Sequence, residues 1–434
     1  MIDVSTNHLK AGRLSRLHER GTSFVYTQLS GLDNAVSLTM PLQPQSWDWD
    51  YGLLPIFEMN LPEGALRASL QNRFAKALGH FDALDLLAIT GRHQIGRLQY
   101  SGSDDFGALD TADTIGGAQR GKQRGKAGFH SVDEILAARR GGGLFEYLMS
   151  AYAPQSGISG VQPKVLIQDV SKFSAAEKFS SQFEKGRASV SLSSATHIVK
   201  LWEPSEFPEL AANEYFCLKA ASRAGLTVPA CHLSQSGQAL IVERFDLQVR
   251  AGGSPELGEG RYMGFEDFCV LNGVNADDKY RGSYEAKLFK RLIDYISPAT
   301  SHEDLAALFK LFVLNVVIRN GDAHLKNFGL IYHSLIGPVR LAPAYDLVTT
   351  PVYIPQDSMA LTLGGSTRWP SRDKLKRLGQ SLCELTLSQI NHIIDEVLDA
   401  VAETQSELGQ YFKDSPSPDI GRDMIKVWND GLKI

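Results

Sequence analysis

The stretch NGDAHLKNF, residues 320–328, decides the fold. The apolar-rich run before it, 303–319, predicts a helix, and the run 328–332 predicts a strand. A phosphotransferase needs a carboxylate that orients the attacking hydroxyl and accepts its proton, and a nearby Asn oxygen that binds metal. Asp322 and Asn327 supply both groups at the spacing D-x-x-x-x-N on one helix-to-strand loop. The competing interpretation is an Asn-Gly turn with a capping Asp, but the order of helix, Asp, Asn and strand favours the catalytic one.

A second acidic residue follows this loop. Asp346 lies in the stretch LAPAYDL, residues 341–347, after the next short predicted strand. Its separation from Asn327 is what a second metal-binding carboxylate requires, in the role of the D-F-G aspartate of protein kinases. Without residues 320–328, Asp346 would be read as an ordinary turn residue.

Upstream, a glycine-containing loop and a strand lysine are the candidates for holding phosphate. Residues 157–164 read GISGVQPK, in which Gly157 and Gly160 let the backbone approach a ligand while successive N–H groups form a nest for anions. The Walker A spacing is absent, so this stretch alone is a weak signal. Lys200 lies in the apolar strand THIVKLW, 196–202. An exposed lysine is the more ordinary interpretation, and the functional one is that its ammonium group neutralises phosphate oxygens.

His324 and the cysteines are the other residue types in the chain that could bind a metal. His324 either binds metal or moves a proton, or it braces the loop by hydrogen bonds. No second His or Cys lies at ligand spacing, which favours the bracing interpretation. The 4 cysteines include no CxxC pair, so a zinc site or a disulfide framework is not indicated and a reducing compartment is.

Composition sets the broad class. The chain has 434 residues, which at roughly 100–200 residues per domain predicts two or three domains. Its net charge of −5 argues against a chain that wraps nucleic acid by itself. No apolar run approaches the ~20 residues of a membrane-spanning helix, and the N-terminus shows no signal segment. We therefore expect a cytoplasmic protein without a membrane partner.

The first hundred residues predict a β-rich module with some helix. Strands are expected at 24–26 and 35–38, and helices at 63–77 and 81–88. Residues 111–128 are rich in Gly and basic side chains and predict a linker. Its charges, from Arg120 to Lys126, indicate a solvated connector, with a phosphate contact in a larger assembly as the alternative.

The rest of the chain changes from strands to helices. Strands are predicted at 164–168, 196–202 and 239–245, and a helix at 213–224 that stops at Gly225. The polar segment 171–194 and the Gly-rich segment 250–260 predict exposed loops. A later helix begins at Thr386, where Gln389 completes a capping box.

The order of these motifs resembles the HipA family, the serine/threonine-kinase toxins of bacterial type II toxin–antitoxin modules. The resemblance extends over nearly the whole chain. Its stretches are SFVY at 23–26, SLTMP at 37–41, LPEG at 61–64, SGVQPK at 159–164, THIVKL at 196–201, NEY at 213–215, VERFD at 242–246, GDAHLKNF at 321–328 and YD at 345–346.

This resemblance implies an α+β fold of the protein-kinase-like, two-lobed kind, with a β-rich N-terminal lobe and a helical C-terminal lobe. An extra β-rich subdomain precedes them. The implied domains are the N-terminal subdomain at 1–110, a Gly-rich basic linker at 111–141, the N-lobe at 142–247 and the C-lobe at 248–434.

The resemblance also implies roles for single residues. Asp322 is the implied catalytic aspartate, and Asn327 and Asp346 are the implied Mg2+ ligands. The implied ATP-binding residues are Gly157, Ser159, Gly160, Lys164, Lys200, Glu243, Phe245, Asp246 and His324. Among these, Lys200 meets the phosphates, the backbone of Glu243 and Phe245 holds adenine, and Asp246 lies near the ribose.

The implied function is transfer of the ATP γ-phosphate to a Ser or Thr of a cellular protein, as the toxin of a persistence module. An aminoacyl-tRNA synthetase, such as the glutamyl enzyme, is the natural expectation for the protein substrate. The implied partners are a HipB-type helix-turn-helix antitoxin and, through that complex, operator DNA. In one departure, Gly157 stands where some family members carry an autophosphorylated serine, so Ser159 and then Ser156 become the candidate sites.

Two other functions compete with this interpretation. Small-molecule phosphotransferases of the aminoglycoside or choline kinase type also use G-D-x-x-x-x-N, although Asn320 replaces the usual His of that loop. A co-repressor that mainly clamps a DNA-binding antitoxin would not need all of Lys200, Asp322, Asn327 and Asp346. Because all four are present, we retain co-repression as an additional role.

Overall fold

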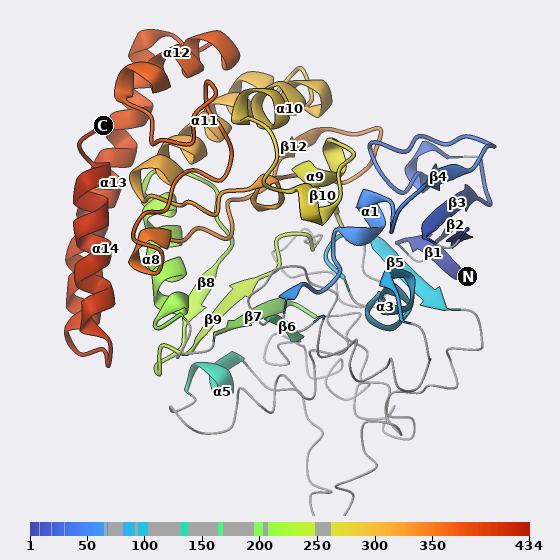
Figure 1. Cartoon of the computed structure of the whole chain (residues 1–434), viewed down its shortest axis with the longest axis horizontal. Coiled ribbons are helices and arrows are strands. Elements are labelled where there is room, and N and C mark those ends of the chain that lie inside the picture. Colours follow the sequence, from blue (N-terminus) through green and yellow to red (C-terminus); the bar gives the residue numbers. More distant parts are fainter. Residues whose placement is uncertain are drawn as a thin grey trace, which may run out of the picture. The chain divides into compact units, whose positions relative to one another are not determined.

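A computed structural model of the chain describes residues 1–7, 9–18, 20–29, 31–64, 67, 81–91, 94–102, 132–137, 164–167, 195–202, 207–247 and 262–434. The chain divides into two compact units (Figure 1). The first comprises Met1–Leu201 with Ser234–Met263, and the second comprises Trp202–Leu233 with Gly264–Ile434. The predicted linker at 111–128 and the predicted loops at 171–194 and 250–260 lie outside the described residues, and the predicted domain bounds stay a prediction.

The first unit begins with a 5-stranded antiparallel sheet in the order β4-β3-β2-β1-β5. Side chains of β1 alternate, so that Ile2 and Val4 face the core. Two helices of this part are α1, Pro55–Glu58, and α3, Ala83–Thr90. The five strands are β1 Ile2–Thr6, β2 Leu9–Leu17, β3 Gly21–Tyr26, β4 Trp47–Trp49 and β5 Leu98–Gly102. The predicted β-rich module is thus confirmed.

The strand predicted at 35–38 is wrong. The chain forms a 3-10 turn at Leu32–Asn34 and then a tight turn in which Ser37 and Met40 make an isolated bridge. The hydroxyl of Tyr26 accepts the backbone N–H of Val36 at 3.0 Å and donates to the carbonyl of Met40 at 2.5 Å. A buried tyrosine therefore satisfies backbone groups that a neighbouring strand would otherwise pair. Most of the predicted helix 63–77 lies outside the described residues.

A second antiparallel sheet in the first unit places β7, His197–Leu201, between β6, Lys164–Ile167, and β9, Ala239–Glu243. All three strands match the predicted strands, with shorter ends. Helix α5, Val132–Leu136, packs on this sheet. Their shared core consists of Val132, Ile135, Val165, Ile167, Val199, Leu201, Ala239 and Ile241.

The second unit is mainly helical. Its helices are α8 Leu210–Arg223, α9 Phe268–Leu271, α10 Lys290–Tyr295, α11 Ser301–Val317, α12 Arg372–Leu382, α13 Leu387–Lys413 and α14 Pro418–Gly431. Its strands are β8 Cys231–Leu233 and an antiparallel sheet of β10 Gly264–Asp267, β11 Gly329–Tyr332 and β12 Val339–Leu341. The α+β class predicted from the sequence is confirmed.

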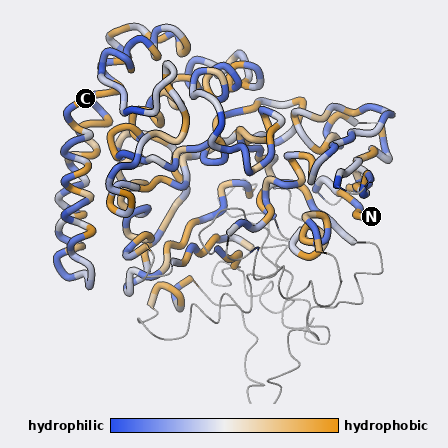
Figure 2. Tube along the Cα trace, viewed as in Figure 1, coloured by the Kyte–Doolittle hydropathy of each residue, from blue (hydrophilic) through white to orange (hydrophobic). Residues whose placement is uncertain are grey.

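Long helices of this unit follow the sequence pattern. The N-terminus of α13 carries the predicted capping box, because the side chains of Thr386 and Gln389 each bond the other's backbone N–H. Helices α13 and α14 lie side by side (Figure 1), and apolar and polar segments alternate along both (Figure 2). Their apolar faces bury residues such as Val397 and Trp428. Among the described helices, none is long and apolar enough to cross a membrane.

Candidate active site

The loop at 320–328 leaves α11 through an abrupt turn. Arg319 adopts a positive φ of 56°, which redirects the chain after the helix. Asn320, buried in the core, then connects helix and loop: its Nδ2 donates to Asn315 Oδ1 at 2.7 Å and its Oδ1 accepts the N–H of Asp322 at 3.1 Å. The loop therefore starts from a side-chain amide anchored in α11, as the predicted helix–loop–strand order requires.

Gly321 is sterically required at its position. A Cβ atom there would lie 2.0 Å from Asp357 Oδ2, far inside van der Waals contact. The N–H of Gly321 donates to Thr350 Oγ1 at 2.9 Å, and Thr350 also bonds the carboxylate of Asp357. The backbone before Asp322 therefore lies against Asp357, an acidic residue that was not predicted from the sequence.

Asp322 projects a half-exposed carboxylate, whose Oδ1 accepts a hydrogen bond of 2.6 Å from the hydroxyl of Tyr280. Partial burial raises the pKa of Asp322 above its usual value, and the negative charges of Asp346 and Asp357 raise it further. The bond from Tyr280 and the charge of Lys279 lower the pKa but do not cancel the rise. The site therefore concentrates negative charge around Asp322.

The two predicted metal ligands lie close to this aspartate. Asn327 donates from Nδ2 to the carbonyl of Asp322 at 2.7 Å, which fixes the amide so that its oxygen faces away from that carbonyl. Asp346 adopts a positive φ of 52°, and its own carbonyl accepts from Asn320 Nδ2 at 3.5 Å. A non-Gly residue held in the left-handed region is uncommon and clusters at functional sites.

This donor set fits magnesium. Carboxylate and amide oxygens are hard ligands, and Mg2+ is commonly held by one or two carboxylates together with substrate phosphates and water. Within the described part of the chain, no three or more His, Cys, Asp or Glu residues gather into a protein-only metal site. A cation held by Asp346 and Asn327 would offset the negative charge that raises the pKa of Asp322.

His324 lies against the same carboxylate. Its Nε2 is 3.9 Å from Asp322 Oδ1, and its ring meets the ring of Tyr280 edge-on at 5.0 Å between centroids. Its backbone N–H donates to the carbonyl of Asp322 at 2.7 Å, and its carbonyl accepts from the N–H of Asn327 at 3.0 Å. These are the contacts of a residue that braces the loop. A contact between His324 and ATP stays a prediction.

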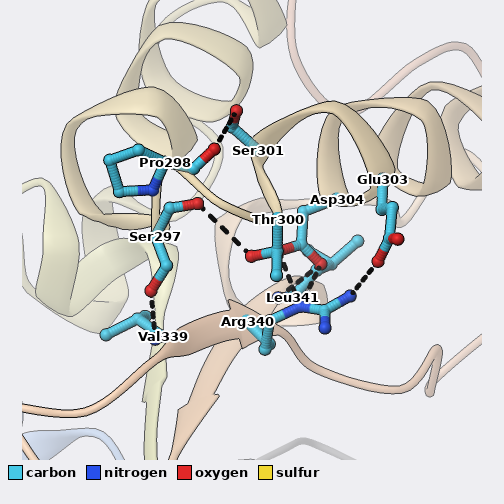
Figure 3. A network of polar contacts seen from close by, with 9 residues as sticks. All are labelled: Ser297, Pro298, Thr300, Ser301, Glu303, Asp304, Val339, Arg340 and Leu341. Atoms are coloured by element: carbon cyan, nitrogen blue, oxygen red, sulfur yellow. Dashed lines mark hydrogen bonds and ion pairs between the residues drawn. The ribbon is translucent and has the colours of Figure 1, made fainter.

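Figure 3 shows a network of polar contacts that joins the start of α11 to β12. The carboxylate of Asp304, near the start of α11, accepts from Arg340 Nε at 2.9 and 3.1 Å and from the N–H of Leu341 at 3.3 Å. Thr300 donates to the same carboxylate at 3.1 Å. Because α11 leads into residues 320–328 and β12 leads toward Asp346, this network fixes the two segments relative to each other.

In the first unit, the two candidate phosphate lysines are opposite each other. Lys164 of β6 and Lys200 of β7 are paired in the antiparallel register. They are only 7% and 4% exposed, so the ordinary interpretation of Lys200 as a surface lysine is wrong. Negative charge stabilises a buried ammonium group, and phosphate oxygens would supply such charge.

The end of β9 holds a buried ion pair. Arg244 donates to Asp246 from Nε at 3.0 Å and from Nη2 at 2.6 Å, and Asp246 Oδ2 also accepts the N–H of Gly96 at 2.7 Å. Both side chains are 1% exposed. Asp246 therefore joins the strand to the N-terminal module. Its predicted contact with the ribose stays a prediction, and the burial of its carboxylate argues against that contact. The adenine contacts of Glu243 and Phe245 also stay predictions.

Some predicted residues cannot be placed and some contacts were not foreseen. Gly157, Ser159, Gly160 and Ser156 lie outside the described residues. Three residues that contact the loop were not predicted from the sequence. Tyr280 bonds Asp322 Oδ1, Tyr284 bonds the carbonyl of Ala323, and Asp357 lies beside Gly321. The only available signal was the acidic and aromatic run DDKYRGSY at 277–284, which also fits an ordinary surface turn.

Family models match both parts of the chain. Residues 156–405 match the model described as HipA-like C-terminal domain, and residues 2–101 match the model described as HipA N-terminal domain. The first match alone extends over more than half of the chain.

Similar proteins carry kinase names. "Putative kinase Y4mE" of Sinorhizobium fredii is 32% identical over 241 residues, which are 52% of this chain and 54% of the relative. "Putative kinase Y4dM" of the same organism is 33% identical over 200 residues, which are 42% of this chain and 44% of the relative. The chain thus spans about half the length of these curated relatives.

A solved structure extends the similarity to the whole chain. HipA of Shewanella oneidensis, solved in a complex with HipB and operator DNA, superposes with a TM-score of 0.60 at 17% identity. The superposition covers 100% of this chain and 96% of that chain. At this identity the match is evidence for the fold, and it confirms the fold predicted from the sequence.

Proposed function

The chain belongs to the HipA family, and from this premise we propose that it is a magnesium-dependent serine/threonine protein kinase, the toxin of a type II toxin–antitoxin module. The single observation that carries the proposal is the geometry around Asp322. Asn327 and Asn320 bond the backbone of Asp322, and Asn320 also bonds the backbone of Asp346. A catalytic carboxylate and two oxygen ligands for metal are thereby held on neighbouring segments.

In this mechanism the protein positions groups and stabilises charge. The carboxylate of Asp322 accepts a hydrogen bond from the acceptor Ser or Thr hydroxyl and takes its proton as the γ-phosphoryl group is transferred. Asn327 and Asp346 would hold Mg2+, which would supply positive charge to neutralise the phosphate oxygens. Lys200 and Lys164 neutralise the phosphates of ATP. No residue forms a covalent intermediate.

The metal role is tested by Asp346→Ala. This change removes an anionic ligand of the cation, so Mg2+-dependent ATP affinity should fall while ATP binding measured without metal changes little. Calorimetric titration of both proteins with ATP, with and without Mg2+, measures the difference. Equal Mg2+-dependent affinity in the two proteins would remove Asp346 from the metal site.

The protein substrate is proposed to be an aminoacyl-tRNA synthetase, such as the glutamyl enzyme, as the family resemblance implies. The experiment is incubation of the protein with radiolabelled ATP and a cell lysate, followed by mapping of phosphorylated residues. Labelled Ser or Thr in a synthetase supports the proposal. Labelling of small metabolites in place of protein would favour the small-molecule phosphotransferase alternative.

We also propose a HipB-type helix-turn-helix antitoxin and operator DNA as partners, with this chain acting as co-repressor. Support comes from the similar HipA, which was solved with HipB and operator DNA. The net charge of −5 predicts weak, nonspecific DNA binding by this chain alone. Specific binding should require the antitoxin, whose recognition helix reads the major groove. Specific retardation of operator DNA by the chain alone would contradict this proposal.

A further inference from the structure

Tyr280 combines an exposed ring with a directed hydroxyl. The residue is 49% exposed, yet its hydroxyl donates to Asp322 Oδ1 at 2.6 Å. That length is typical of a hydrogen bond between a hydroxyl and an ionised carboxylate, which is stronger than one between neutral groups. An exposed tyrosine has water available to its hydroxyl, so this direct contact calls for a cause in the surrounding structure.

The cause lies in the contacts of the tyrosine ring and its backbone. The rings of Tyr280 and His324 pack edge to face at an interplanar angle of 78°. On the backbone, the N–H of Leu325 donates to the carbonyl of Lys279 at 3.2 Å. The ammonium group of Lys279 lies 5.5 Å from the centre of the Tyr280 ring. The segment before Tyr280 is therefore attached to the loop that carries Asp322, and the hydroxyl is delivered to the carboxylate.

The loop itself fixes only the backbone of Asp322. Its N–H is bound by Asn320, and its carbonyl accepts from the N–H of His324 and from Asn327 Nδ2. Within the residues that the structure describes, the bond from Tyr280 is the one hydrogen bond made to the carboxylate oxygens. His324 Nε2, at 3.9 Å, is near but beyond hydrogen-bond distance. The hydrogen bond from Tyr280 therefore limits rotation of the carboxylate about the Cβ–Cγ bond of Asp322.

We propose that Tyr280 is a positioning residue that locks the carboxylate of Asp322 by holding Oδ1, so that Oδ2 is presented to the acceptor hydroxyl. This inference rests on the proposed kinase function and adds a residue that acts through Asp322. Without the hydroxyl, the carboxylate samples rotations that do not align it with the acceptor, and the turnover rate falls. ATP affinity is unaffected, because Tyr280 acts on the acceptor side of the reaction.

The test is Tyr280→Phe, which keeps the ring and its contact with His324 and removes only the hydroxyl. We expect kcat for protein phosphorylation to fall roughly tenfold while KM for ATP stays the same. In an Asp322→Ala background the same change should cause no further loss, because the group through which it acts is gone. The matched control is Tyr332→Phe, which removes a buried hydroxyl bonded to Glu266 at 2.5 Å and should lower the melting temperature with kcat unchanged.

Three kinetic results would overturn the inference: an unchanged kcat in Tyr280→Phe, a raised kcat, or an equal loss in the Asp322→Ala background. A raised kcat would mean that the tyrosine hydroxyl blocks the acceptor position. A second measurement does not depend on kinase activity. Thermal unfolding compares the wild type, Tyr280→Phe, Asp322→Ala and the double variant of these two changes. The shifts in Tm should be non-additive, whereas additive shifts would contradict the interaction between Tyr280 and Asp322. A wild type that transfers no phosphate would refute the kinase proposal, and the unfolding series would still decide the role of Tyr280.

Discussion

Lys164 and Lys200 face each other across β6 and β7, and both are almost completely buried. Directly opposed positions in an antiparallel pair place Cβ atoms about 4.5–5.5 Å apart, so the two side chains start from neighbouring points of the sheet. Negative charge stabilises a buried ammonium group. In the proposed function, the phosphates of ATP supply such charge.

Lys200→Met should weaken ATP binding roughly tenfold to a hundredfold, because a hydrogen bond to a charged group contributes about 1.5–3 kcal/mol. The rise in melting temperature that ATP produces should shrink accordingly. Lys219→Met is the control, since Lys219 pairs with Glu407 and lies over the ring of Tyr215 on the surface of the second unit. A full ATP-induced rise in the Lys200→Met protein would show that this lysine does not hold phosphate.

The buried pair of Arg244 and Asp246 should dominate the stability of the first unit. Arg244→Met leaves Asp246 buried without its partner, and breaking such a pair costs about 3–5 kcal/mol. The double variant Arg244→Met with Asp246→Leu should recover much of this loss, because no unpaired charge remains. Urea unfolding measures both. If the Arg244→Met protein unfolds at the same urea concentration as the wild type, the ion pair does not contribute to the stability of the protein as proposed.

Two glycine substitutions should act in opposite directions. Gly321→Ala places a Cβ 2.0 Å from Asp357 Oδ2, so the loop must shift and both kinase activity and thermal stability should fall. Gly409→Ala lies within α13, where the nearest atom to a Cβ would be 3.5 Å away. Alanine should raise stability there by about 0.5–1 kcal/mol. Wild-type activity in the Gly321→Ala protein would contradict the packing beside Asp322.

Two buried cysteines should be unreactive. Burial raises the pKa of the thiols of Cys217 and Cys383 to about 12. At pH 8 such a thiol is ionised in only about one molecule in ten thousand, and the thiolate is the reactive form. Iodoacetamide at pH 8 should leave both residues unmodified in the folded protein and modify them after unfolding, as peptide mass spectrometry can show. Rapid alkylation of Cys217 before unfolding would contradict its burial.

The sequence predicted those parts of the site that depend on local spacing. Asp322 and Asn327 lie on one loop, and the helix before it and the strand after it follow from the apolar pattern. The sequence did not predict Tyr280, because its contact joins residues far apart in the chain and its exposed ring leaves no hydrophobic pattern. Burial of Arg244 and Asp246 could not be anticipated either, because two charged residues separated only by Phe245 usually lie at a surface. The strand predicted at 35–38 failed because the hydroxyl of Tyr26 bonds that backbone.

In the proposed function, Asp322 supports magnesium-dependent transfer of phosphate from ATP to protein. The most direct test of this role compares the wild type with Asp322→Asn in the same lysate, using γ-labelled ATP with and without Mg2+. Circular dichroism and calorimetric titration first establish that the variant is folded and binds ATP. We predict labelled protein only with the wild type and Mg2+, and a loss of about 10²–10⁴-fold in the variant. Equal labelling by the two proteins, or none by the wild type, would contradict this role.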